Sequence, residues 1–211
     1  MIPEAEHVYA AVLARDDGRV VARDHAGDAV ELASARWLAG AEAIDLRVLT
    51  RARAPVLDVG CGPGRHVRAL DGRGVRALGL DASPAAVRLA RERGTAVVLG
   101  SVFGAVPAAG TWRTALLLDG NIGIGGDPAV LLARVSQLLA PGGTVLCECD
   151  APGTGVRRGP LRLEHGRRAS DWFPWARVGV DALDDVAGAA GLRVSTRWSD
   201  GGRWFGRLEA S

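Results

Sequence analysis

The chain has 211 residues with 26 basic and 24 acidic side chains, a formal net charge of +2, and 48% hydrophobic residues. This length and hydrophobic content fit one domain, or one domain with an added cap, around a buried core. The charge is too small to predict nucleic-acid binding by the chain as a whole.

Three cysteines, Cys61, Cys147 and Cys149, give an odd number without a CxxC spacing. They predict no disulfide framework and therefore favour a reducing compartment. The first residues are acidic where a signal peptide is basic, and no apolar run is long enough to span a membrane. We expect a cytoplasmic protein that does not enter a membrane.

Residues 1–53 are expected to form an N-terminal cap. The pattern predicts a short helix over 3–15 and two short strands within 19–32, on either side of residues 25–28. Over 35–50, apolar residues recur at helical spacing, which predicts one amphipathic helix that packs on a larger body.

Residues 54–211 show alternating strand and helix patterns, which predict a parallel sheet in an α/β domain. Asp200-Gly201-Gly202 resembles a hairpin turn, so the last strand should run antiparallel. The predicted strands cover 55–59, 75–80, 96–99, 114–119, 144–149, 192–198 and 203–208, and the predicted helices cover 64–72, 84–94, 127–139 and 180–190.

Three carboxylates, Asp58, Asp81 and Asp119, each follow an apolar strand. Ligands of such sheets bind beyond the carboxyl ends of the strands, so these acids should share one edge. Asp81 lies where a carboxylate can accept hydrogen bonds from both ribose hydroxyls of a nucleoside, although it could also cap the next helix.

The stretch Val-Leu-Asp-Val-Gly-Cys-Gly-Pro-Gly at 56–64 joins a strand to a helix through three alternating glycines. Glycines allow a sharp turn and a close backbone approach to a ligand. The dinucleotide pattern G-x-G-x-x-G would require glycine where Arg65 stands. The stretch instead resembles the glycine loop of class I S-adenosylmethionine (SAM)-dependent methyltransferases.

The resemblance covers about residues 54–211 and implies a Rossmann-like, doubly wound seven-stranded sheet that is mostly parallel with an antiparallel last strand. It implies SAM as cofactor and S-adenosylhomocysteine (SAH) as product. The family often has an acid after the third strand, and this chain has Ser101 there. The cofactor-binding residues that the resemblance implies are Asp58, Gly60, Cys61, Gly62, Gly64, Asp81, Ala82, Ser101, Val102 and Asp119.

The segment 118–126 follows the fourth strand, where this family brings donor and acceptor together. Asp119 and Asn121 are therefore candidate catalytic residues, although the segment could be only a glycine-rich turn. His165 is the candidate general base, against the alternative of a solvent-exposed histidine. His25 and Asp45 are weaker candidates, and His66 could touch the cofactor or only pack.

Arginines and tryptophans gather in residues 151–178, which should form a loop over the donor. Arginines there could bind an anionic acceptor while aromatic side chains exclude water. The alternative is a solvated loop whose tryptophans anchor it to the core. The candidate substrate-binding residues are Arg157, Arg162, Arg168, Trp172 and Trp175.

We therefore predict a SAM-dependent methyltransferase that methylates a small molecule, possibly an anion, at O, N or S by in-line displacement. The cysteines are expected to pack rather than to bind zinc, and no metal is expected. The alternatives are a non-catalytic SAM-binding or scaffolding protein, a nucleic-acid or protein methyltransferase, and a nicotinamide-dependent oxidoreductase. The acceptor, the methylated atom and the oligomeric state are left open.

Overall fold

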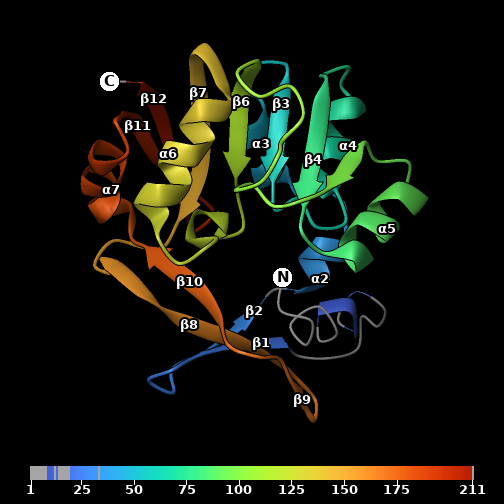
Figure 1. The fold of residues 1–211 in the computed structure, drawn as a ribbon, viewed down its shortest axis with the longest axis vertical. Coiled ribbons are helices and arrows are strands. Elements are labelled where there is room, and N and C mark those ends of the chain that lie inside the picture. The colour runs from blue at the N-terminus through green and yellow to red at the C-terminus, as the bar shows by residue number, and fades with distance from the viewer. Residues whose placement is uncertain (1–8, 12, 14–19, 33, 211) are drawn as a thin grey trace.

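A computed structural model describes residues 9–11, 13, 20–32 and 34–210. Two sheets make up its strands, one of seven strands and one of five. Figure 1 shows the larger sheet with its helices as the main body and the smaller sheet below it.

The larger sheet has the order β11-β12-β7-β6-β3-β4-β5 and confirms the predicted seven-stranded Rossmann-like architecture. Its central pairs are parallel, whereas β12 is antiparallel to both β7 and β11. Its strands are β3 (Val56–Val59), β4 (Ala77–Asp81), β5 (Val97–Leu99), β6 (Trp112–Leu117), β7 (Leu139–Cys149), β11 (Leu192–Asp200) and β12 (Arg203–Ala210).

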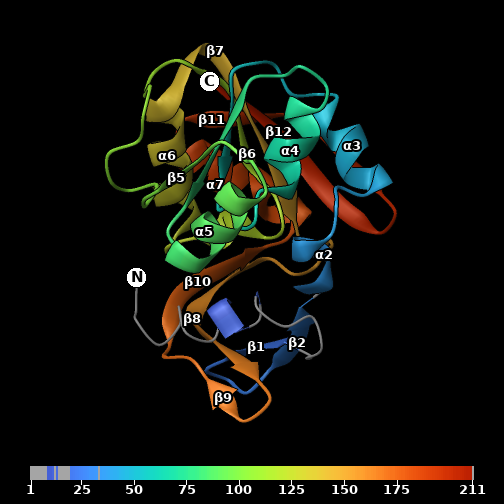
Figure 2. The ribbon, with the colours of Figure 1, turned by 90° about the vertical axis from the view of Figure 1, so that its right-hand side faces the viewer.

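Helices cover both faces of this sheet because its strands are apolar on both sides. Figure 2 shows α6 and α7 on one side and α3 and α4 on the other. The bounds are α3 (Ala43–Leu49), α4 (Arg65–Asp71), α5 (Pro84–Glu92), α6 (Pro128–Leu138) and α7 (Leu183–Ala189), with short 3-10 turns η1 (Asn121–Gly123) and η2 (Val180–Ala182).

The expected single helix over 35–50 is two helices, α2 (Ser34–Leu38) and α3. The chain leaves helical geometry at 39–42, and a capping box between Glu42 and Asp45 starts α3 anew. Of the expected helix over 3–15, residues 9–11 and 13 are helical and the rest lies outside the described residues.

The smaller sheet joins residues 20–32 to residues 156–178. The expected strands within 19–32 are β1 (Val20–Asp24) and β2 (Ala29–Leu32), and β1 also pairs antiparallel with β8 (Val156–His165). On the other side of β8 lies β10 (Phe173–Val178), and β9 (Arg168–Ala169) closes the tip. We call β8, β9 and β10 the arm.

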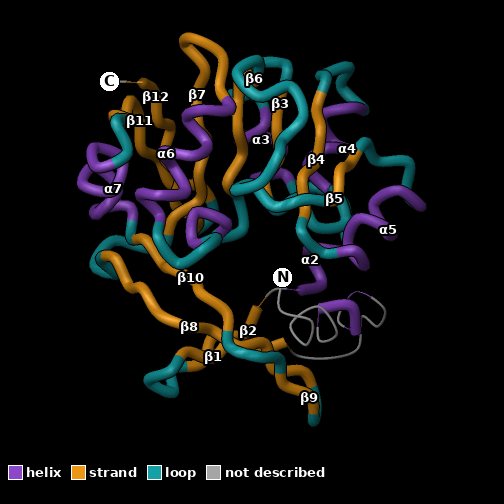
Figure 3. The backbone as a smooth tube through the Cα atoms, in the orientation of Figure 1, coloured by secondary structure: helices purple, strands orange, loops and turns teal. Residues whose placement is uncertain are grey.

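The arm corrects the expectation of a loop over 151–178, and Figure 3 shows these residues mostly as strands. Gly159 and Pro160 within β8 are residues that strands usually disfavour. Pairing with β10 orders β8 from 156 to 161, and pairing with β1, far away in the sequence, orders it from 161 to 165. The smaller sheet therefore combines strands from the expected N-terminal cap, residues 1–53, with strands from the expected methyltransferase domain, residues 54–211.

Strands β3, β4 and β6 all point their carboxyl ends toward α2 and the smaller sheet (Figure 1). The carboxyl edge of the larger sheet therefore faces the arm. Among the described residues, no helix is long and apolar enough to cross a membrane.

Candidate active site at the carboxyl edge

The glycine loop leaves β3 through Gly60, Gly62 and Gly64, all with positive φ of 71°, 53° and 84°. A Cβ on Gly60 would lie 2.7 Å from Nδ2 of Asn121, and one on Gly62 would lie 3.1 Å from the Tyr9 hydroxyl. Any larger side chain would collide with Asn121 at position 60 and crowd Tyr9 at position 62. Glycine is therefore required for this loop to turn and to leave its backbone accessible to a ligand.

Asp81 joins the glycine loop to β4. Its carboxylate accepts hydrogen bonds from the backbone N–H of Gly62 at 2.7 Å and of Ser83 at 2.8 Å. The helix cap that the sequence offered as an alternative belongs to Ser83, which accepts from the N–H of Ala86. Asp81 therefore orders the loop, and its ribose contact stays a prediction.

Asp58 is buried behind the loop with 1% of its surface exposed. Its Oδ2 has no hydrogen-bond partner among the described residues and lies 3.4 Å from Nδ1 of His66. Burial opposes protonation of His66, but Asp58 and Asp45 outweigh it and raise the pKa of the imidazole to about 9. His66 is therefore a buried cation at neutral pH.

This loop fits a nucleoside cofactor with a charged amino-acid end. Asp58 Oδ2 makes no hydrogen bond among the described residues and lies 3.4 Å from His66, so it retains the capacity to accept from an ammonium group. The positive φ angles and missing side chains of Gly60 and Gly62 suit close backbone contact. Both features match the methionine end of SAM.

Asp119 ends the loop after β6 in the left-handed conformation, with φ 56°. Both of its carboxylate oxygens lie 2.7 Å from Nη2 of Arg65. Burial opposes ionisation, but His66 and Arg65 outweigh it and lower the pKa of Asp119. Asp119 is thus an ionised, partly exposed acceptor at the carboxyl edge.

Asn121 lies beside Asp119, as the sequence predicted, but its side chain is turned toward the cofactor loop. Its amide donates to the carbonyls of Val59 and Gly60, both at 2.9 Å. These bonds make Asn121 a brace between the 118–126 segment and the glycine loop.

His165 does not join Asp119 and Asn121. It ends β8 and pairs with Arg168 of β9, which Figures 1 and 2 show at the tip of the arm, away from the body. His25, a weaker candidate, packs on Trp172 with ring centroids 5.2 Å apart. Local sequence could not reveal that β8 carries His165 away from the carboxyl edge.

The other predicted cofactor residues differ in exposure. Ala82 and Ser101 are exposed, whereas Val102 is buried in the core. Cys61 is buried against Gly79 and Val67, and burial raises the pKa of its thiol, so it is no nucleophile. Cys147 and Cys149 are buried as free thiols in the core.

The predicted acceptor residues lie on the arm but do not converge. Arg162 is paired with Glu164 at 2.6 Å and lies over the Trp172 ring. Arg157 is 61% exposed, and Arg168 is exposed on β9. The arginines therefore do not form one anion site.

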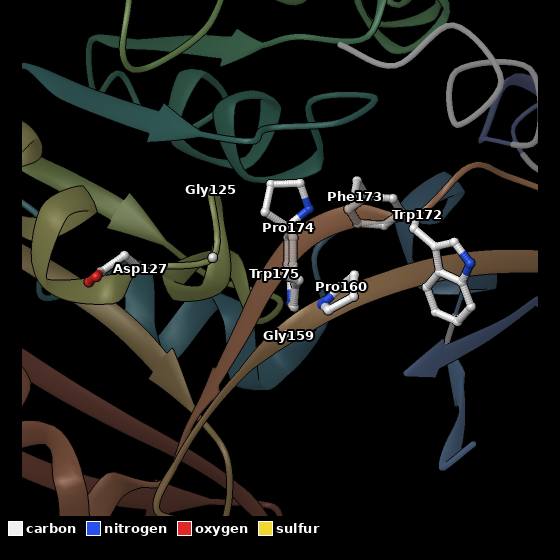
Figure 4. A pocket seen from close by; sticks show the side chains of 9 residues that line it. Gly125, Asp127, Gly159, Pro160, Trp172, Phe173, Pro174 and Trp175 are labelled. Atoms are coloured by element: carbon white, nitrogen blue, oxygen red, sulfur yellow. The ribbon is translucent and has the colours of Figure 1, made fainter. Parts of the chain in front are cut away.

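Trp172 and Trp175 do come together at a surface pocket of about 440 Å³ (Figure 4). Its walls are two arm segments and the glycine-rich segment after β6, so it joins the arm to the body. The lining residues are Gly125, Gly126, Asp127, Gly159, Pro160, Trp172, Phe173, Pro174 and Trp175.

The sequence reasoning missed Arg65, Glu148 and Arg203. Arg203 donates to Asp45 at 2.7 Å and to both oxygens of Glu148 at 2.7 Å. Arg65 was visible only as the residue that breaks the dinucleotide pattern. For Glu148, the signal in the sequence was a charged residue inside the apolar strand β7, which suggests that it has a charged partner.

Comparisons with known proteins agree with this fold. Residues 56–143 match the family model described as "Methyltransferase domain". The search of curated proteins found no match.

Solved structures share the fold. A SAM-dependent methyltransferase from Bacteroides fragilis, solved with SAH, is 22% identical, with a TM-score of 0.79 over 99% of this chain and 95% of its own. CcbJ from Streptomyces caelestis is 19% identical, with a TM-score of 0.62 over 79% of this chain and 88% of its own. CalS10 from Micromonospora echinaspora, an amino pentose methyltransferase with bound SAM, is 21% identical, with a TM-score of 0.57 over 80% of this chain and 89% of its own. Residues 56–143 thus match a methyltransferase domain, and the whole chain has the fold of SAM-dependent methyltransferases.

Proposed function

We propose that this methyltransferase acts on a small-molecule acceptor that binds between the carboxyl edge of the body and the arm. The observation that carries the proposal is an open surface pocket of about 440 Å³ between the segment after β6 and the arm. Its volume falls within the range of small-molecule sites. CalS10, an amino pentose methyltransferase, supports the same acceptor class by its shared fold.

When bound, SAM supplies a methyl group on a sulfonium, which a nucleophile can take by in-line displacement. The backbone of Gly60, Gly62 and Gly64 would hold its methionine end, with Asp58 near the ammonium. Asp81, Ala82, Ser101 and Val102 would hold the nucleoside. These contacts contribute by positioning, which can supply much of the rate enhancement of a displacement reaction.

The acceptor side is built mainly of apolar surface. Trp175 packs edge-to-face on Phe173 with ring centroids 6.1 Å apart, and Trp172 stands further along the same strand segment (Figure 4). Aromatic walls exclude water and bind the apolar face of a ring or sugar. Since Arg162 is already paired with Glu164, the proposal does not require an anionic acceptor.

No described histidine stands at the carboxyl edge as a free base. His66 is buried between carboxylates, and His165 is on the tip of the arm. We therefore propose that the methyl acceptor is itself a competent nucleophile and that the protein orients it. Asp119, an ionised carboxylate at the carboxyl edge of the sheet, could accept a hydrogen bond from it.

Calorimetry with SAM, followed by incubation of the protein with labelled SAM and a metabolite extract, tests the proposal. We expect saturable SAM binding and a labelled small-molecule product by mass spectrometry. Labelling only of protein or nucleic acid would contradict it.

Asp81→Ala probes the cofactor side of the same proposal. It should weaken SAM binding by about tenfold or more, because it removes charged hydrogen bonds and frees the glycine loop. Asp71→Ala, an exposed acid on α4, is the matched control and should bind SAM like the wild type. Equal affinity of both variants would exclude Asp81 from the cofactor site.

A further inference from the structure

His66 is a buried histidine that the proposed function does not use. It lies in the first turn of α4, directly after the glycine loop, and its side chain is 4% exposed. Its Nδ1 lies 3.4 Å from Oδ2 of Asp58, and its Nε2 lies 3.9 Å from Oδ1 of Asp45. The imidazole therefore lies between two carboxylates that are themselves buried.

The two carboxylates differ in how many other cations they contact. Asp45 also accepts hydrogen bonds from Arg65 and from Arg203. Among the described residues, His66 is the only basic group within 4.0 Å of the Asp58 carboxylate. A buried carboxylate without a counter-charge is costly, so the free protein needs His66 as the cation for Asp58.

Four charged groups face the imidazole, each from a different segment. They are Asp58 from β3, Asp45 from α3, Arg65 from α4 and Asp119 from the segment after β6. Burial and Arg65 oppose protonation of His66, but the two nearest carboxylates outweigh them. His66 therefore carries a proton in the free protein at neutral pH.

The charge of Asp58 also reaches the glycine loop itself. Asp58 is the last but one residue of β3, two positions before Gly60. Burial, and after it the charges of Asp58 and Asp81, raise the pKa of the Cys61 thiol within the loop. A cation seated at the loop would therefore interact with the same carboxylate that pairs with His66.

The ammonium of SAM is such a cation, and one buried carboxylate can neutralise only one positive charge. An α-amino group has an ordinary pKa of about 7.7–8.0, so the ammonium is charged at pH 6.5. Once it pairs with Asp58, the imidazolium loses its counter-charge and meets a like charge. Both changes favour neutral imidazole, and so does burial.

We propose that binding of SAM expels the proton from His66. The ammonium replaces the imidazolium as the cation that pairs with Asp58, and the proton passes to the solvent. Neutral His66 then stays behind the loop as a positioning residue for the Asp58 carboxylate. This inference rests on the proposed function, because it needs the methionine end of SAM at the glycine loop.

Calorimetry of SAM binding at pH 6.5, in buffers with different ionisation enthalpies, counts the protons released. The wild type should release about half a proton or more for each SAM bound, because a histidine without its carboxylate partner has a pKa of about 6.5 or below when buried. 5′-Methylthioadenosine has the nucleoside but not the amino-acid end, so its binding should release none.

His66→Gln identifies the source of the proton. Glutamine cannot titrate and keeps an amide donor near Asp58, so this variant should bind SAM without releasing a proton. His165→Gln changes a histidine at the tip of the arm and is the matched control, which should release as many protons as the wild type. If His66→Gln does not fold, the comparison of SAM with 5′-methylthioadenosine carries the test.

The outcomes separate this inference from the proposed function. If SAM does not bind, both fail together. If SAM binds without proton release, or if His66→Gln releases as many protons as the wild type, only this inference fails. Equal release on binding of 5′-methylthioadenosine and of SAM would also overturn it, because the ammonium would then not be the cause.

Discussion

The two walls of the site are built by opposite means. On the body side, Asp119 is held by Arg65 and Glu148, and Asp58 and His66 are buried behind the glycine loop. On the arm side, the ion pairs of Arg162 with Glu164 and of Arg177 with Asp150 are more exposed to solvent. Charges held in a fixed geometry cost little reorganisation during a reaction. The two sides therefore differ in how far their charged pairs are shielded from solvent, with the body side the more buried.

Substitutions where η1 packs on β10 should destabilise the protein clearly. A Cβ on Gly123 would overlap the carbonyl oxygen of Ala176 and lie 2.7 Å from Nε1 of Trp175. Gly123→Ala should therefore push β10 away from η1 and destabilise the protein by about 1–3 kcal/mol. Denaturant unfolding measures the change.

The matched control for this junction is Gly188→Ala in α7, where a Cβ would meet nothing within 4 Å. Alanine should stabilise that helix slightly. If both variants unfold at the same denaturant concentration, the arm is not packed on η1 as described.

The buried charges on the body side predict that the stability of the protein depends on pH. The pKa of His66 is raised to about 9 from an ordinary 6.5. Its stabilisation is therefore complete below pH 6.5 and is lost as the pH rises through 9, with a full extent on the order of 3 kcal/mol.

His66→Gln isolates this dependence. The variant should unfold at a lower temperature than the wild type at pH 6, and the difference should shrink toward pH 9.5. Thermal unfolding across this range is the measurement. Parallel curves for the two proteins would show that His66 is not a buried cation.

The smallest effect is expected on the arm. Arg157 is 61% exposed and its nitrogen lies 3.9 Å from an oxygen of Asp28. Exposed ion pairs contribute little, so Arg157→Gln should change the free energy of unfolding by less than about 0.5 kcal/mol. It should also leave acceptor labelling unchanged. A clear loss of labelling would restore the hypothesis of an anionic acceptor.

Most of the body could be predicted from the sequence because its signals are local. The alternation of apolar runs predicted β3, β4 and β6, and the glycines predicted the turn after β3. Asp58, Asp81 and Asp119 were recognisable because each lies at or near the carboxyl end of an apolar strand. The arm was not recognisable, since Gly159 and Pro160 resemble a loop until β10 pairs with that part of β8.

The sequence by itself determined the family resemblance, the order of the body strands and the acids at their ends, because a repeating pattern and a short motif act over few residues. The tertiary structure alone decided that Arg65 pairs with Asp119 and Arg203 with Asp45, that Asn121 braces the glycine loop, and that His165 lies away from the site. These outcomes depend on contacts between residues far apart in the chain, and such contacts leave no periodic signal.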